Sequence, residues 1–194
     1  MKRMVYADNA ATTQLDIEAF EAMKPFLLME YGNASQPYSF SRTAKRALKE
    51  SRETIANCIG ASPEEIYFTS GGTESDNWVI KGSAFSDPLK GATITSSIEH
   101  HAILHACADI ERLGYPVAYL PVNTRGEVSH KTLDVWITNK TRLVSIMFAN
   151  NEIGTIQDIK TLCDISHSKG ALFHTDAVQA VGHMHIDVKK LGID

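Results

Sequence analysis

The sequence predicts an α/β protein with a mostly parallel sheet and helices on both faces. Short apolar runs of strand length alternate with longer segments of helical pattern along most of the 194 residues. Glycines and capping residues mark many of the boundaries between them. No repeat, low-complexity tract or linker interrupts the alternation. Because strands separated by helical crossovers pair in parallel, this order of elements favours one parallel sheet.

The first two helices have recognisable ends. One is expected over residues 16–31, with Asp16 as its N-terminal cap and Gly32 as its stop. The second is expected over residues 42–59 and ends before Gly60. Both segments therefore precede the first predicted strand.

Strands and helices alternate through the remaining residues. The predicted strands are 66–69, 92–95, 117–120, 143–148 and 171–174. The predicted helices between and after them are 73–84, 101–113, 133–137 and 159–169. Residues 187–194 are expected to form a short helix that leads into a further strand, so we expect the chain to be part of a larger domain.

Composition excludes several classes of protein. The net charge of −4, with 43% hydrophobic and 22% charged residues, is ordinary for a globular protein and does not favour nucleic acid or an anionic membrane as partner. The three cysteines are far apart and form no CxxC motif, which favours free thiols in a reducing compartment over disulfides or a zinc site. Asp8 comes too early for a signal peptide, and no apolar run approaches the roughly 20 residues of a membrane helix. A cytoplasmic location is therefore expected.

A glycine-rich turn joins the first predicted strand to the next helix. It reads Ser-Gly-Gly-Thr-Glu over residues 70–74. Glycine allows close approach of the backbone to a ligand, and the N–H groups of a helix N-terminus attract phosphate. The Thr73 hydroxyl can add a hydrogen bond. Such a turn can also be structural only, and its spacing matches neither a P-loop nor a dinucleotide-binding turn.

His100 follows a predicted strand and begins a helix. An imidazole there can stack on a flat ring or transfer protons, or it can cap the helix without further function. His101 and His105 lie four residues apart on one helical face, which raises the alternative of a metal. Without a third ligand or an HExxH motif, we expect no metal.

Asp176 comes directly after the last predicted strand. A carboxylate beside a pyridine nitrogen keeps that nitrogen protonated, although an aspartate here can also cap a turn. Gln179 and Asn151 each follow a strand and could reach a ring oxygen. Ligands of parallel α/β sheets bind beyond the carboxyl ends of strands, where these residues fall together with the glycine-rich turn. A phosphate site and an acid for a ring nitrogen together suggest pyridoxal 5′-phosphate (PLP).

These motifs and their order resemble the NifS/IscS-type cysteine desulfurases, which are PLP enzymes among the class V aminotransferase-like proteins. The resemblance covers essentially the whole chain. The motifs that carry it are YADNAATT at 6–13, GNAS at 32–35, TSGGTESDN at 69–77, EH at 99–100, NNEIGT at 150–155 and HTDAVQ at 174–179.

The resemblance implies a role for each matching residue. His100 would stack on the ring and transfer protons, so it is the expected catalytic residue. Asp176 would pair with the ring nitrogen, and Asn33 would border the substrate. The implied cofactor-binding residues are Gly72, Thr73, His100, Asn151, Asp176 and Gln179.

The resemblance also implies an activity and an architecture. The activity is conversion of L-cysteine to L-alanine, with the sulfur passed on as a persulfide to an acceptor such as an iron–sulfur scaffold, in a homodimer. Residues 1–15 would belong with a small domain, and 16–194 would form the incomplete large domain of a fold type I PLP enzyme.

Several family features do not occur in these 194 residues. The lysine that bonds the cofactor, in a Ser-x-His-Lys segment, the persulfide-forming cysteine and the arginine that grips the substrate carboxylate have no counterpart. Lys189 and Lys190 lack that context. We therefore expect the chain alone to be inactive. The alternatives are another class V PLP enzyme, such as a selenocysteine lyase or an aminotransferase, and a truncated, non-catalytic binding protein.

Overall fold

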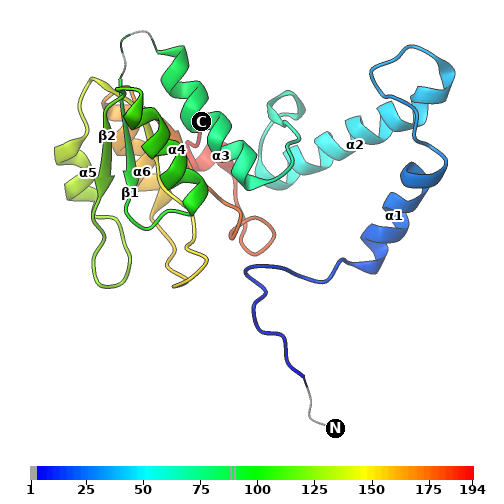
Figure 1. Ribbon diagram of the computed structural model, residues 1–194, viewed down its shortest axis with the longest axis horizontal. Coiled ribbons are helices and arrows are strands. Elements are labelled where there is room, and N and C mark those ends of the chain that lie inside the picture. The colour runs from blue at the N-terminus through cyan, green and yellow to red at the C-terminus, as the bar shows by residue number, and fades with distance from the viewer. Residues whose placement is uncertain (1–3, 88, 90) are drawn as a thin grey trace. The chain divides into compact units, whose positions relative to one another are not determined.

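The computed structural model describes residues 4–87, 89 and 91–194 (Figure 1). The chain divides into two compact units, Met1–Ile66 and Tyr67–Asp194. The predicted boundary after residue 15 is a different division, and it stays a prediction. Among the described residues, no helix combines the length and the apolar character that crossing a membrane requires.

Unit 1 contains helices α1 (Ile17–Leu28) and α2 (Arg42–Ile59) and the 3-10 turns η1 (Ser39–Ser41) and η2 (Pro63–Glu65). The cap at Asp16 is confirmed, since its carboxylate accepts hydrogen bonds from the backbone N–H of Glu18 and Ala19. The bounds predicted for α2 are also confirmed, and its C-cap Gly60 has a φ of 72°.

The prediction that α1 extends to residue 31 was wrong. The helix ends at Leu28, because the carbonyl of Pro25 accepts from the N–H groups of both Met29 and Glu30 and the chain turns away. Gly32 does not stop the helix. A Cβ at Gly32 would lie 2.4 Å from the Phe40 carbonyl oxygen, so this glycine permits a close approach of two backbone segments.

Unit 2 carries the sheet. Its strands are β1 (Ala92–Ser96), β2 (Val117–Leu120), β3 (Thr141–Ser145) and β4 (Leu172–His174). Their order is β2-β1-β3-β4, and all three pairings are parallel. The helices are α3 (Gly72–Ser86), α4 (His101–Arg112), α5 (His130–Trp136), α6 (Ile159–Ser168) and α7 (Val188–Leu191). The predicted α/β class with a parallel sheet is confirmed.

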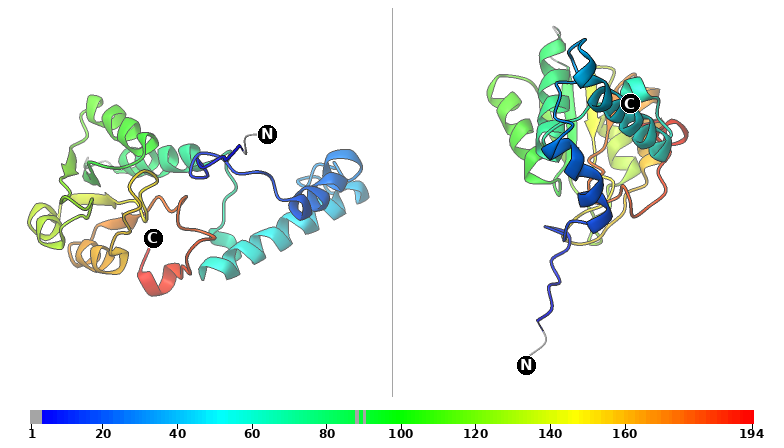
Figure 2. Two further views of the ribbon diagram at one scale, coloured as in Figure 1. Left: turned by 90° about the horizontal axis from the view of Figure 1, so that it is seen from below. Right: turned by 90° about the vertical axis from the view of Figure 1, so that its right-hand side faces the viewer.

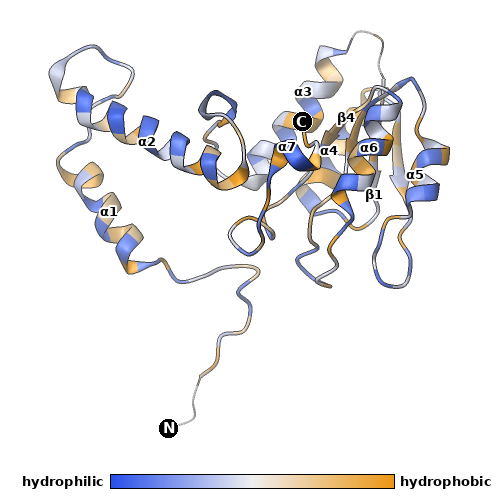
Figure 3. Cartoon of the chain, turned by 180° about the vertical axis from the view of Figure 1, so that it is seen from behind, coloured by the Kyte–Doolittle hydropathy of each residue, from blue (hydrophilic) through white to orange (hydrophobic). Residues whose placement is uncertain are grey.

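The helices of unit 2 cover both faces of the sheet. Figure 2 shows α3 and α4 on one side of the strands and α5 and α6 on the other. Alternation within a strand explains this, since Val144 of β3 packs with Leu162 and Phe173 in one apolar cluster while Leu143 packs with Ile103 in another. The strands are accordingly coloured largely as hydrophobic in Figure 3.

Two predicted strands differ from the structure. Residues 66–69 form no strand, because η2 precedes them and none of the four strands pairs with them; Tyr67 instead packs edge-on against Trp78 of α3, with ring centroids 5.5 Å apart. The strand predicted at 143–148 lies at Thr141–Ser145. Past it, Ile146 and Phe148 still donate backbone hydrogen bonds to the carbonyls of His174 and Asp176. These bonds place the segment after β3 beside the segment after β4.

Candidate functional site

The carboxyl ends of β1, β3 and β4 bring the predicted residues to one edge of the sheet. These strands are neighbours and parallel, so the segments that follow them emerge side by side. His100 follows β1, Asn151 follows β3 and Asp176 follows β4. The N-terminus of α3 carries Gly72 and Thr73 and also belongs to unit 2.

The glycine-rich turn forms the start of α3. Gly71 occupies the N-cap position with a φ of 156° and a ψ of 177°, a combination that glycine adopts readily. Glu74 folds back so that its carboxylate accepts from the Ser70 hydroxyl at 2.7 Å and the Ser70 N–H at 2.6 Å. These hydrogen bonds, that of the hydroxyl first, lower the pKa of Glu74. The N–H groups of Gly72 and Thr73 belong to the first turn, where a helix offers them no carbonyl acceptor.

Gly72 leaves room that a larger residue would remove. A Cβ at this position would lie 2.8 Å from Cγ2 of Val178, which follows Asp176. The start of α3 and the segment after β4 are therefore in direct contact through Gly72. At Gly82 of the same helix, a Cβ would lie 3.6 Å from Trp78, an ordinary contact.

Substitution of the two glycines by alanine is expected to give opposite results. Gly72→Ala forces the stiff Val178 side chain to move and should lower the free energy of unfolding by about 1 kcal/mol. Gly82→Ala is the matched control in α3, and its better helix propensity should raise that free energy by about 0.5 kcal/mol. Chemical denaturation of both variants measures the difference. Equal stability of the two variants would contradict the close contact at Gly72.

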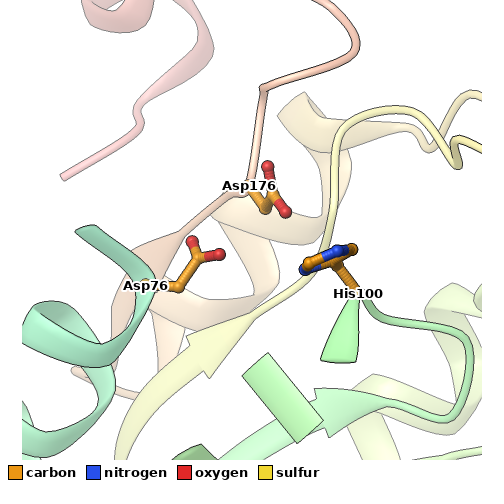
Figure 4. Close-up of side chains that lie close together, drawn as sticks. All are labelled: Asp76, His100 and Asp176. Carbon is orange, nitrogen blue, oxygen red and sulfur yellow. The ribbon is translucent and has the colours of Figure 1, made fainter. Parts of the chain in front are cut away.

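Asp76, His100 and Asp176 converge at the sheet edge (Figure 4). One side-chain ligand atom from each lies within 4.8 Å of the others. Asp76 comes from α3, His100 is the N-cap of α4 and Asp176 follows β4. Groups at this spacing could also hold a metal ion, so the expected absence of a metal stays a prediction. The arrangement places two carboxyl groups and one imidazole around one small volume.

Burial and nearby charge shift the pKa values of Asp76 and of the neighbouring His174. Asp76 is 3% exposed, and its burial, followed by the charge of Asp176, raises its pKa to about 7. His174 lies nearby, with Nε2 3.8 Å from Oδ1 of Asp76 and Nδ1 2.9 Å from the hydroxyl of Ser145. Burial lowers the pKa of His174 to about 4, so this imidazole is neutral at pH 7.

Glu99 is a second buried acid, one residue before His100. Its Oε1 accepts from the Ser96 hydroxyl at 2.6 Å and from the Met147 N–H at 3.0 Å, which ties the end of β1 to the segment after β3. Its Oε2 is buried without a hydrogen-bond partner. Burial raises the pKa of Glu99 to about 8, against the two hydrogen bonds that lower it. Glu99 is therefore mostly protonated at neutral pH and supports the backbone that presents His100.

A backbone hydrogen bond to His100 indicates which of its two ring nitrogens carries the proton. Nδ1 accepts the N–H of Ala102 at 3.2 Å, so the neutral ring carries its proton on Nε2. His100 is exposed, and it lines a hollow of about 300 Å³ together with Asn151. The preceding Asn150 has a structural role, since its side chain bonds to the Ile98 carbonyl and to the N–H groups of Glu152 and Ile153.

Gln179 and Asn33 are the remaining predicted site residues. Gln179 is half-buried and lies in the turn after β4, three residues beyond Asp176. Asp176 also shapes this turn, because its Oδ1 accepts the Val178 N–H at 3.0 Å. Asn33 belongs to unit 1, where its side chain accepts the Ser35 N–H at 3.0 Å. Its role toward a substrate stays a prediction.

Sequence reasoning missed Asp76, Glu99 and His174. All three lie within motifs that were recognised, TSGGTESDN, EH and HTDAVQ. Asp76 and His174 have helical and strand patterning around them, and Glu99 lies in the connection between β1 and α4. A polar residue on the buried face of an element is the signal that could have identified them. Asp76 has this signal, because it precedes the buried Ile80 by four residues on the same face of α3.

The fold and this site define a class of protein. The aminotransferase class-V family model matches residues 5–194, and the chain belongs to that family. The predicted fold class, that of the large domain of fold type I PLP enzymes, is confirmed by solved neighbours. A NifS-like protein superposes with a TM-score of 0.93 at 39% identity, over 96% of this chain and 52% of its own. A structure described as SspA in complex with cysteine gives 0.94 at 39% identity, over 97% and 55%.

Curated relatives carry more particular names. The chain is 54% identical over 193 residues to the cysteine desulfurase IscS of Methanosarcina thermophila, covering 99% of the chain and 48% of the relative. It is 51% identical to the cysteine desulfurase IscS of Dictyoglomus turgidum, covering 100% and 50%. The resemblance to NifS/IscS-type cysteine desulfurases is thus confirmed, and the chain spans about half the length of these relatives.

Proposed function

We propose that this chain forms the cofactor-binding half of a PLP-dependent cysteine desulfurase. The observation that carries the proposal is the convergence of Asp176 and His100, whose side-chain atoms lie within 4.8 Å of each other and of Asp76. The donor set fits PLP, since a helix N-terminus suits the phosphate, a carboxylate suits the ring nitrogen and an imidazole suits the ring face. At the neighbouring Gly71, a Cβ would meet no described atom within 4 Å, so the backbone of this turn is open to the close approach of a phosphate.

Each residue has a distinct task in this proposal. The first turn of α3, with Gly72 and Thr73, holds the phosphate. Asp176 holds a proton on the ring nitrogen, and Asn151 and Gln179 contact the ring oxygen. When bound, PLP supplies an electron sink for the substrate. His100 stacks on the ring, and its Nε2 is the atom that gives and takes the proton, because Nδ1 is engaged by Ala102.

The substrate and partners of the proposed enzyme follow from its family. L-cysteine would be converted to L-alanine, with its sulfur passed as a persulfide to an acceptor such as an iron–sulfur scaffold. We propose a homodimer in the cytoplasm.

Two of the three free cysteines, Cys107 and Cys163, are buried, and burial raises the pKa of each thiol to about 12, which makes them unreactive. Neither is suited to carry the persulfide.

Binding of pyridoxine 5′-phosphate tests the proposed cradle. This probe has the ring and the phosphate but no aldehyde, so it does not bond to surface lysines. We expect it to bind the chain at least tenfold more tightly than pyridoxine, because charge-assisted hydrogen bonds to the phosphate each contribute about 1.5–3 kcal/mol. Equilibrium dialysis measures both affinities. Equal affinity of the two compounds would contradict a phosphate site at α3.

We expect the 194-residue chain by itself to release no sulfide from L-cysteine. The residues that bond PLP and accept the sulfur in the family have no counterpart among those present, so only the cofactor cradle is available. Sulfide is assayed with PLP and L-cysteine, and free PLP without the chain is the control. Release above that control would contradict the expectation. Release of selenide from selenocysteine, with no sulfide from L-cysteine, would favour a selenocysteine lyase.

A further inference from the structure

Asp76 is a buried acid to which the proposed function gives no task. It lies in α3, one turn beyond the phosphate-binding segment, and is 3% exposed. A charged aspartate is rarely buried to this extent unless it is paired. The nearest cation candidate, the imidazole of His174, lies beyond hydrogen-bonding distance at 3.8 Å. Stability therefore does not account for an acid here, because an apolar residue would fill the space at less cost.

The surroundings of Asp76 lead from the sheet interior to the candidate site. Ser145 of β3 holds Nδ1 of His174 at 2.9 Å, and Nε2 of His174 faces Asp76. On its other side, Asp76 approaches Asp176 and His100 within 4.8 Å. Polar groups thus succeed one another, at 2.9 Å, 3.8 Å and at most 4.8 Å, from a buried strand hydroxyl to the carboxylate proposed to meet the ring nitrogen.

We propose that Asp76 is a positioning residue that keeps its own proton beside Asp176 and thereby sets the negative charge presented to the ring nitrogen. The inference rests on the proposed PLP site. Two carboxyl groups this close do not both ionise readily, so Asp76, which is buried, tends to keep its proton until a cation arrives. A protonated ring nitrogen is such a cation. Its arrival releases the proton of Asp76, and the second negative charge then stabilises the protonated ring.

Four titratable groups face Asp76 from the elements around it. Asp176 and Glu99 repel its ionised form, whereas His174 and His100 are imidazoles that turn cationic only on protonation. His174 is neutral at pH 7, so it does not neutralise Asp76. Asp176 is the one acid of the four that lies at the ring position, which makes it the group to remove in a test.

Titration of the Asp76 side chain by NMR tests the inference in the full chain. The carboxyl carbons are labelled with ¹³C through aspartate and followed from pH 4 to 9. The midpoint of Asp76 is expected to fall by about one pH unit in Asp176→Asn, because a like charge is removed. Asp164→Asn is the matched control, since it removes an exposed carboxylate of α6 that pairs with Lys160. An Asp76 midpoint that is the same in the wild type and Asp176→Asn would overturn the inference.

A second titration uses ligands and separates the inference from the proposed function. Saturating pyridoxine 5′-phosphate is expected to lower the Asp76 midpoint of the wild-type chain by about one unit or more, because it brings a protonated nitrogen. Inorganic phosphate is the control without a ring and should leave the midpoint unchanged. Failure of the probe to bind, with coupling to Asp176 intact, would contradict the proposed function alone. Binding of the probe with no change at Asp76 would overturn the inference.

Discussion

Replacement of Asp176 by asparagine is expected to weaken pyridoxine 5′-phosphate binding by about 100-fold, which is the loss typical when one partner of a desolvated charge pair is removed. Asparagine is nearly isosteric and keeps the Oδ1 that accepts the Val178 N–H. The turn should therefore persist, and only the charge facing the ring nitrogen is lost. Equilibrium dialysis at pH 7.5 measures the affinity.

The same substitution should stabilise the chain without ligand. Asp76 and Asp176 repel each other, and removal of one charge should raise the free energy of unfolding at pH 8 by about 1 kcal/mol. Weaker binding with greater stability is the signature of a residue kept for function. Asp164→Asn is the control and should change neither quantity. A variant that binds the probe as tightly as the wild type would refute the role of Asp176.

A second large effect is a loss of stability between pH 6.5 and pH 8. The folded-state pKa values of Glu99 and Asp76 are about 8 and about 7, against ordinary values of 4.5 and 3.8. The folded chain thus binds more protons than the unfolded chain across this range, so its free energy of unfolding falls as the pH rises. Integration over the range gives a loss of about 2 kcal/mol.

His174 acts in the opposite sense at lower pH. Its pKa falls from 6.5 to about 4, so below pH 6.5 the unfolded chain takes up a proton that the folded chain does not. This opposes the two acids on acidification, and between pH 6.5 and 8 it offsets only a small part of their effect. The pH dependence in this range therefore reports mainly the buried acids of the site.

Urea denaturation of Glu99→Gln separates Glu99 from Asp76. Glutamine retains the Oε1 that accepts from Ser96 and Met147, yet it does not ionise. We expect most of the fall between pH 6.5 and 8 to disappear in this variant, since Glu99 has the higher pKa of the two acids. Glu111→Gln changes an exposed acid of α4, the helix that follows Glu99, and should leave the fall intact. Stability that stays constant from pH 6.5 to 8 in the wild type would contradict a buried, protonated Glu99.

Much of the fold follows from local signals. Asp16 and Gly60 begin and end their helices as predicted, because capping depends on a few neighbouring backbone groups. β2 has its predicted bounds, and β1, β3 and β4 lie within a few residues of theirs. The segment 66–69 shows the limit of such reasoning: its composition suits a strand, but strand formation needs a partner, and the sheet provides none.

The candidate site was partly predictable for the same reason. Gly72, His100, Asn151 and Asp176 could be placed at strand ends and helix starts from their motifs, and the parallel sheet brings those ends together. The individual roles of the two adjacent amides were not predictable. Asn150 closes a turn while Asn151 lines the hollow, a distinction that depends on which side chain meets the Ile98 carbonyl.

The sequence by itself determined the family, the order of elements and the set of residues from which a PLP site can be built, because these depend on motifs and on local backbone preferences. Only the tertiary structure decided that Asp76 approaches Asp176 and that Glu99 is tied to Met147. Charge and burial act through space between residues 48 to 100 positions apart. A pattern of neighbours along the chain does not contain those distances, so the raised pKa of Asp76 is a property of the fold.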